Sequence, residues 1–315
     1  MGIKMGTALD GANVAWEADS YAKGKGKEPL RCVSCAASVT HQSAHARERD
    51  DKPVLVPAYF RLLPHMHHAD DCKHAVAKAL KTIAKDSHGL IESLRDKKYR
   101  LRLMMIKDAL SAIGGNIAES RGSSRASSSR TFERSSSKLP AYINSAQRVL
   151  QLRAMCDEDA EIAEHLELLF EGNTVVPWGQ FYYEAERYLD AYHAALHNTV
   201  QHPIAIHGVV DSIRFVNGKY GPTNVLNLIT PKSIKDANDP KNGIRVQASC
   251  WSKDGDWFDG FVPGAEIVLL GMFKATAGTP QPSTQPGKYR FDTFSTHKMS
   301  ITLSVRAQVA PVPVK

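Results

Sequence analysis

Long apolar runs are missing from this sequence, and so are several motifs that mark common enzyme classes. No run approaches the roughly 20 apolar residues that cross a bilayer, which argues against a membrane-spanning helix. The start of the chain lacks the apolar core of a secretory signal, so we expect no export by that route. A Walker loop, a Gly-x-Ser-x-Gly elbow and a recognisable Cys/His nucleophile are also missing. We therefore expect no membrane partner and none of these enzyme chemistries.

Cysteine is scarce: the 315 residues include only five. Three of them fall into one constellation, Cys32-x2-Cys35 followed by His68-x3-Cys72. The remaining two, Cys156 and Cys250, lie far apart in apolar or helical surroundings. This usage favours a reducing cytoplasm over a disulfide scaffold, so we expect a cytoplasmic location.

The Cys/His constellation has the composition of a zinc site. A thiolate pair on a tight turn and a His/Cys pair four residues apart can complete a tetrahedron around Zn²⁺. We expect a helix to begin at the second pair, which would place His68 and Cys72 on one helix face. No ligand position is left open, which favours structural zinc over catalytic zinc. Other nearby histidines leave the histidine ligand open, and a redox-active Cys-x2-Cys is the competing interpretation.

Charge is unevenly distributed. The formal net charge is +7, and the basic surplus is concentrated in residues 95–138, whereas residues 151–196 are strongly acidic. The basic segment either contacts phosphate or pairs with the acidic segment. Within it, residues 120–138 are rich in Arg and Ser, and form either a solvated linker or a segment that orders on nucleic acid. The arginines concerned are Arg121, Arg125, Arg130 and Arg134.

The pattern along the chain predicts an α+β multidomain protein. Residues 1–75 are expected to form a small zinc-binding α/β module. Residues 76–200 are expected to form a helical region, with basic helices over 73–88 and 95–113 and acidic helices within 157–190 that offer a docking surface for a protein partner. Residues 201–315 change to β texture.

The sequence pattern of the C-terminal region predicts five strands, at 204–215, 224–230, 244–251, 265–277 and 299–309. Gly208 lies inside the first strand and indicates a sharp bend or bulge. Asn217-Gly218 is a strong hairpin signal. Five strands, a bent first strand and a long loop before the fifth are typical of a small closed barrel of the OB type.

The first quarter of the chain resembles the N-terminal zinc-binding module of competence CoiA-like proteins. The residues that carry the resemblance are Ala8-Leu-Asp, Cys32-Val-Ser-Cys, Tyr59-Phe60 and His68-Ala-Asp-Asp-Cys72. In that family the module precedes a restriction-type nuclease domain. This sequence departs from the pattern because no strand-borne Asp followed by Glu-x-Lys follows the module, so the resemblance does not extend to nuclease activity.

Residues 203–310 resemble an OB-fold nucleic-acid-binding domain, through Ile206-His-Gly-Val-Val, the number of strands and Trp251. The resemblance implies a ligand face on the second and third strands. The same barrel can also serve protein contacts or architecture alone. Transferred by position, the candidate nucleic-acid-binding residues are Lys219, Tyr220, Asn227, Arg245, Gln247 and Trp251.

Together these features favour a non-enzymatic, single-stranded nucleic-acid-binding protein of bacterial or mobile-element origin with a structural zinc ion. The bound strand is either DNA or RNA. Two alternatives stay open: a metal-dependent nuclease, as the competence-like module suggests, and a protein-interaction adaptor in a defence or conjugation complex.

Overall fold

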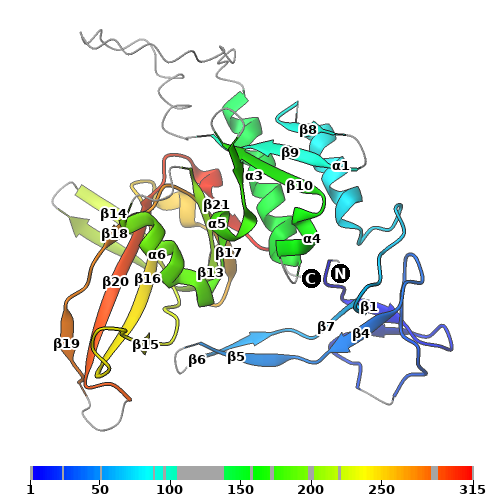
Figure 1. The fold of residues 1–315 in the computed structure, drawn as a ribbon, viewed down its shortest axis with the longest axis horizontal. Coiled ribbons are helices and arrows are strands. Elements are labelled where there is room, and N and C mark those ends of the chain that lie inside the picture. Colours follow the sequence, from blue (N-terminus) through cyan, green and yellow to red (C-terminus); the bar gives the residue numbers. More distant parts are fainter. Residues whose placement is uncertain are drawn as a thin grey trace.

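Three hydrophobic cores organise the chain in the computed structural model. It describes residues 3–22, 25–49, 52–87, 89–94, 97–104, 138–156, 159–170, 174–197, 202–218, 221–284 and 290–313. In Figure 1 the N-terminal strands lie at the lower right, the middle region lies above them, and a large curled sheet stands on the left. No helix in the described part of the chain is both long and apolar enough to cross a membrane. The protein belongs to the mixed α+β class, as the sequence predicted.

Short strands joined by turns build the N-terminal module, which we define as residues 3–75. Three sheets are present: β2-β1-β3, the pair β4-β7, and the hairpin β5-β6. The strands are β1 (Thr7–Leu9), β2 (Ala15–Glu17), β3 (Arg31–Cys32), β4 (Val39–Gln42), β5 (His45–Arg49), β6 (Lys52–Val56) and β7 (Tyr59–Leu62). The described residues of this module contain no helix, so the predicted α/β module consists of strands and turns.

The first residues of the chain fasten this module to the middle region. Ile3 forms a β-bridge with Cys156, and Met5 forms one with Phe60 of β7. The Lys4 N–H donates to the carbonyl of Met155, at 3.1 Å. Ile3 is buried in the hydrophobic core of the middle region together with Cys156, so the connection is both hydrogen-bonded and apolar.

The middle region contains a four-stranded sheet that the sequence analysis missed. Its order is β11-β10-β9-β8, with β9 and β10 parallel and the other pairs antiparallel. The elements are α1 (Val76–Asp86), β8 (Ile91–Ser93), β9 (Tyr99–Arg102), α3 (Lys138–Met155), α4 (Asp159–Ala163), β10 (Leu166–Phe170) and β11 (Thr174–Val176). Where the sequence predicted a helical region, the described residues thus combine helices with a sheet.

The error has a physical cause in the alternation around β9. Tyr99, Leu101 and Leu103 are buried, whereas Arg100 and Arg102 face the other side. This period of two belongs to a strand, but four residues are too few to outweigh the basic, helix-forming residues around them. Of the residues in the helix predicted over 95–113, the structure describes only 97–104, which contain β9. The others lie outside the described residues.

The acidic stretch 157–190 is only partly helical, which corrects the predicted acidic helices. Its strands β10 and β11 are followed by four short elements: α5 (Trp178–Phe181), β12 (Tyr182–Tyr183), η1 (Ala185–Arg187) and α6 (Tyr188–Leu196). Several of its acids pair within the molecule: Asp159 with Arg153 at 2.6 Å, and Glu167 with Arg100 at 2.8 Å. Arg100 belongs to the basic segment 95–138, so its pair with Glu167 supports the interpretation that the basic segment pairs with the acidic one.

The C-terminal part folds into one ten-stranded sheet. Its main path is β18-β20-β16-β14-β13-β17-β21, with β12, β15 and β19 alongside β13, β16 and β20. The elements are β13 (Ile204–Gly218), β14 (Gly221–Leu228), β15 (Ile234–Lys235), β16 (Asn242–Ser252), η2 (Gly255–Phe258), β17 (Glu266–Gly271), β18 (Lys274–Thr276), β19 (Pro280–Pro282), β20 (Thr293–Thr302), η3 (Arg306–Gln308) and β21 (Val309–Pro311). The first three predicted strands correspond to β13, β14 and β16, and the fourth is divided into β17 and β18. The fifth begins earlier than predicted, at Thr293, and ends at Thr302, and further short strands extend the sheet.

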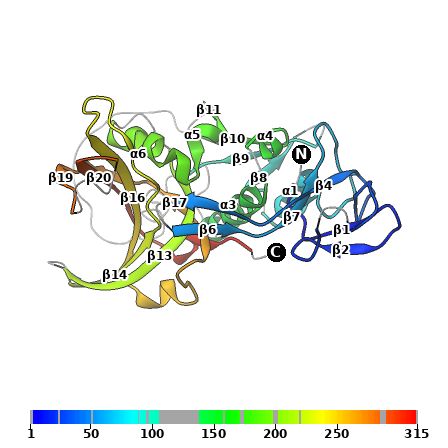
Figure 2. The same cartoon turned by 90° about the horizontal axis from the view of Figure 1, so that it is seen from below.

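The sheet curls strongly because the long strand β13 bends and pairs with two different strands along its length (Figure 2). Its first half pairs with β17 and its second half with β14, with a register shift between Val210 and Ser212. Gly208 lies in the first half, where any Cβ would collide with the Tyr188 hydroxyl and with Leu228. Tyr188 Oη donates to the His207 carbonyl at 2.9 Å. The glycine therefore permits α6 to approach the strand closely.

A charged network that includes the buried Arg153 joins the middle region to the large sheet. Arg153 of α3 is 4 % exposed and pairs with Asp159, while its guanidinium lies 4.5 Å from the ring centroid of Tyr182. Glu184 lies 3.8 Å from Arg153 and 3.7 Å from the Nδ1 of His207 in β13. On its other side, His207 Nε2 lies 3.8 Å from Glu266.

This network predicts a pH dependence of stability. Burial lowers the pKa of His207, but hydrogen bonding and attraction from Glu184 and Glu266 outweigh burial and raise it overall. A raised folded-state pKa stabilises the fold below the unfolded value near 6.5, and this contribution is lost as pH rises through the folded pKa. We expect the stability difference between the wild type and His207→Gln to shrink between about pH 5.5 and pH 8. Urea unfolding midpoints measure it; a pH-independent difference contradicts the prediction.

Candidate metal centre and nucleic-acid interface

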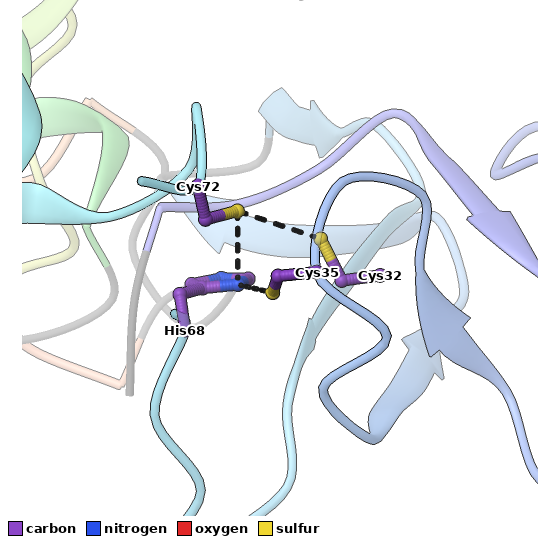
Figure 3. A group of neighbouring side chains, drawn as sticks. All are labelled: Cys32, Cys35, His68 and Cys72. Carbon is purple, nitrogen blue, oxygen red and sulfur yellow. Dashed lines mark hydrogen bonds between the residues drawn. The ribbon is translucent and has the colours of Figure 1, made fainter. Parts of the chain in front are cut away.

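Four side chains from two separate turns converge in the N-terminal module (Figure 3). They are Cys32, Cys35, His68 and Cys72, and their ligand atoms all lie within 4.8 Å of one another. Cys32 Sγ lies 3.8 Å from Cys72 Sγ, and His68 Nδ1 lies 3.3 Å from Cys35 Sγ and 3.5 Å from Cys72 Sγ. A tetrahedral ion with Zn–S of about 2.3 Å and Zn–N of about 2.0 Å places its ligands about 3.5–3.8 Å apart. The cluster therefore fits a metal ion such as zinc.

The first ligand pair lies on a tight turn that follows β3. Cys32 N–H donates to the Ala37 carbonyl at 2.8 Å, and Ala36 N–H donates to the Cys32 carbonyl at 3.0 Å. Ala36 has a φ of 58°, the left-handed conformation that closes the turn. Ser34 N–H lies 3.4 Å from Cys32 Sγ and donates to it. Backbone N–H groups aimed at sulfur favour the thiolate form that binds metal.

The second ligand pair also lies on turns, which corrects the expected helix start. Helix α1 begins at Val76, four residues after Cys72. Cys72 N–H donates to the Ala69 carbonyl at 2.9 Å, so a single turn rather than a helix brings His68 and Cys72 together. His74 N–H donates to Cys72 Sγ at 3.4 Å, as Ser34 does to Cys32.

The protonation states of the four side chains suit a metal ligand set. Burial lowers the pKa of His68 to about 4, so its ring is neutral at pH 7 and has a lone pair to donate. Burial raises the pKa of the Cys72 thiol to about 12. At Cys35 burial acts in the same direction, but the N–H groups of Ala37 and Ala69 outweigh it and lower the pKa. Three thiolates this close together repel one another without a cation, and a divalent ion offsets that repulsion when it displaces the thiol protons.

A second candidate site lies on the large sheet, on the face turned away from its core. Val246, Ala248 and Cys250 of β16 belong to the core, and the alternate residues of β16 face outward. The strand register continues this outer face across β13, β14 and β20. Its residues are Ser212, Arg214, Val216, Thr223, Val225, Asn227, Arg245, Gln247, Ser249, Trp251, Phe294, Thr296, Lys298, Ser300 and Thr302. Three are cationic, two are aromatic and none is acidic.

The predicted sheet residues share this face but differ in accessibility. Arg245 is exposed, and Gln247 and Trp251 are partly exposed. Trp251 Nε1 donates to Ser249 Oγ at 3.1 Å, which holds one edge of the indole. Asn227 is only 9 % exposed and donates to Ser212 Oγ at 3.3 Å, so it supports the face more than it presents a group.

The other predicted nucleic-acid-binding residues lie outside the described residues. They are Lys219 and Tyr220 at the β13–β14 turn, and the arginines of the Arg/Ser-rich segment, Arg121, Arg125, Arg130 and Arg134. Their assignment stays a prediction.

A groove of about 770 Å³ opens at one edge of the outer face, next to the segment before β20. Arg245 lines it, and its Nε donates to Thr296 Oγ1 at 2.8 Å. The guanidinium lies 5.8 Å from the ring centroid of Phe294. Lys232, Arg290 and Phe291 complete the charged and aromatic lining. Sequence analysis missed these residues, although Tyr289-Arg290-Phe291 is a basic–aromatic run that signals them.

The nuclease alternative requires carboxylates that are available to a catalytic metal ion. Two carboxylates of the middle sheet, Glu92 and Glu167, lie next to an arginine instead. Glu92 of β8 is paired in register with Arg100 of β9, and Glu167 lies on β10. Arg100 pairs with Glu167 at 2.8 Å and lies 3.8 Å from Glu92. Arginines thus neutralise both carboxylates. Within the described residues, only the Cys/His cluster brings three or more His, Cys, Asp or Glu ligand atoms together.

No protein-family model matches the sequence, and no curated protein matches it. One solved structure with detectable similarity is a small single-stranded DNA-binding protein from Streptomyces coelicolor, at 16 % sequence identity. The match covers 35 % of this chain and 92 % of that chain, with a TM-score of 0.21. The similarity is distant and confined to part of the chain, and it does not by itself assign a function.

Proposed function

We propose that this protein binds single-stranded nucleic acid on the outer face of its large sheet and carries a structural zinc ion in its N-terminal module. The observation that carries the proposal is the composition of that face, which bears Arg214, Arg245, Lys298 and Trp251 and no acid at its regularly paired positions. One acid, Asp211, lies at the register shift of β13 and accepts a hydrogen bond from Ser212 at 3.3 Å. Cations along a strand-lined surface neutralise phosphates, and an aromatic side chain between them stacks on a base.

The strand pairing supports an OB-type barrel. The five main strands in chain order are β13, β14, β16, β17 and β20. The first pairs with the second and fourth, the second with the third, and the third runs parallel to the fifth. The fourth continues after a two-residue break into β18, which pairs with β20. This arrangement supports closure of the sheet through β17 and β18, and the outer face of the second and third strands is where OB barrels take oligonucleotides.

A single strand fits this face better than a duplex does. The cations lie on a curved sheet, and none of the described helices is presented as a recognition helix for a groove. Stacking needs unpaired bases, which only a single strand offers. The mechanism is stacking and phosphate neutralisation without covalent chemistry.

The zinc ion has a structural role in this proposal. Four protein ligands fill a tetrahedral ion completely, which leaves no position for water or substrate. The reducing cytoplasm keeps the three cysteines as thiols available to the metal. With zinc bound, the two ligand turns are tied to each other and to the β1–β3 sheet.

Replacing Trp251 tests the role of the outer face in binding. Trp251→Ala should weaken binding of single-stranded oligonucleotides by about 5- to 150-fold, because it removes one stacked base. Fluorescence anisotropy with a labelled oligonucleotide measures the change. Trp257→Ala is a matched control, because Trp257 packs against the barrel core through the η2 segment instead of the outer face. An unchanged affinity in a folded Trp251→Ala variant removes the indole from the binding surface.

A further inference from the structure

The groove beside Phe294 differs from the rest of the outer face in charge. It is lined by Lys232, Arg245 and Arg290, and its other lining residues are uncharged. The nearest acid in the sequence, Asp292, does not line the groove and lies 3.9 Å from Lys241. Two arginines, Arg245 and Arg290, in a lining that contains no acid favour an anionic ligand.

The two aromatic residues that line the groove, Phe291 and Phe294, indicate which kind of anion it accepts. Phe291 is buried, and Phe294 lies against it edge to face, with ring centroids 6.0 Å apart and an interplanar angle of 88°. This contact fixes the Phe294 ring, which is partly exposed. A fixed and accessible ring offers a stacking surface for a flat ligand. Simple anions such as phosphate gain nothing from it.

Arg245 joins the ring and the charge in one place. Its Nε is tied to Thr296, and its guanidinium lies next to the Phe294 ring. A planar guanidinium held in this way presents its remaining N–H groups in a fixed direction. A ligand that is flat at one end and anionic at the other can therefore engage both residues at once. The groove volume of about 770 Å³ lies within the roughly 300–1,000 Å³ range of small-ligand sites.

We infer that this groove holds one nucleotide of the bound strand, with its base on Phe294 and its phosphate between Arg245 and Arg290. The inference rests on the proposed function and deepens it, because it separates one anchored nucleotide from the strand that the open face neutralises. A free mononucleotide should then occupy the groove and compete with an oligonucleotide.

The test uses adenosine 5′-monophosphate, adenosine and inorganic phosphate, each titrated into the full-length protein and followed by calorimetry and NMR. We expect the monophosphate to bind more tightly than adenosine or phosphate and to displace an oligonucleotide. Phe294→Leu keeps an apolar side chain but removes the ring, and should weaken the monophosphate at least about fivefold. Lys298→Gln is the matched control: it lies on the open face, so it should weaken the oligonucleotide and leave the monophosphate unchanged.

Three outcomes overturn the inference, and they differ from a failure of the proposed function. Equal binding of phosphate and monophosphate, unaffected by Phe294→Leu, makes the groove a simple anion site. Oligonucleotide binding without monophosphate binding, and with wild-type oligonucleotide affinity in Phe294→Leu, leaves the function standing and removes the nucleotide from the groove. Absence of binding for every ligand overturns the proposed function as well. Thermal unfolding confirms that each variant is folded.

Discussion

We expect Cys35→Ser to release the proposed zinc ion and to unfold the N-terminal module, while the large sheet keeps its structure. The substitution removes one of four ligands whose atoms lie within 4.8 Å of one another, and serine is a poor zinc ligand. Loss of a supporting hydrogen bond around a metal typically costs 10- to 100-fold in affinity, so loss of a ligand should cost more than about 100-fold. Metal binding and folding are coupled in small modules of this kind. We therefore expect about one zinc per chain in the wild type and almost none in the variant.

The two parts of the molecule can be separated in one experiment. NMR signals of the N-terminal module should collapse in Cys35→Ser, whereas those of β13 to β20 should persist. Cys250→Ala is the matched control, because Cys250 is fully buried in the core of the large sheet. It should retain zinc and destabilise the sheet instead. Retention of one zinc per chain in Cys35→Ser refutes the ligand set, and collapse of both parts refutes their independence.

Removing two charges from the outer face produces the second large effect, on affinity and on its salt dependence. Each phosphate contact with a single strand contributes about 0.7 to the slope of log affinity against log salt. The double variant Arg245→Gln, Lys298→Gln should therefore flatten that slope by about 1.4. Lowering the salt from 1 M to 0.1 M should therefore raise the affinity of the wild type about 25-fold more than that of the double variant.

A control with the same change in net charge separates local contacts from overall attraction. Lys85 on α1 and Arg306 on η3 are both exposed and lie away from the outer face. The double variant Lys85→Gln, Arg306→Gln should leave the slope close to that of the wild type. Equal slopes for the two double variants would show that net charge, and not this face, attracts the nucleic acid.

The metal cluster could be predicted because its information is local in the sequence. Two short spacings, Cys32-x2-Cys35 and His68-x3-Cys72, specify the ligands without any knowledge of the fold. The helix expected at the second pair did not form there because the backbone turns at Ala69–Cys72 and the helix starts at Val76. The ligand set was insensitive to that error, because a single turn also brings residues i and i+4 together.

The middle sheet and the groove could not be predicted because they depend on distant pairings. Strand β9 is defined by its parallel pairing with β10, in which Tyr99 lies opposite Leu166. The groove exists because β16 and β20 run parallel, which places Arg245 beside Thr296. The alternation of single strands shows which residues face outward, but it does not show which strands become neighbours. The long strands β13, β14 and β16 of the large sheet were predicted because their alternation extends over many residues.

The most direct test of the account is fluorescence anisotropy of the zinc-loaded protein with a labelled single strand and with a duplex of the same sequence, titrated across salt. The account predicts tighter binding of the single strand than of the duplex at every salt concentration, and a steep loss of affinity as salt rises. Preference for the duplex, or no binding of the single strand at low salt, would contradict it.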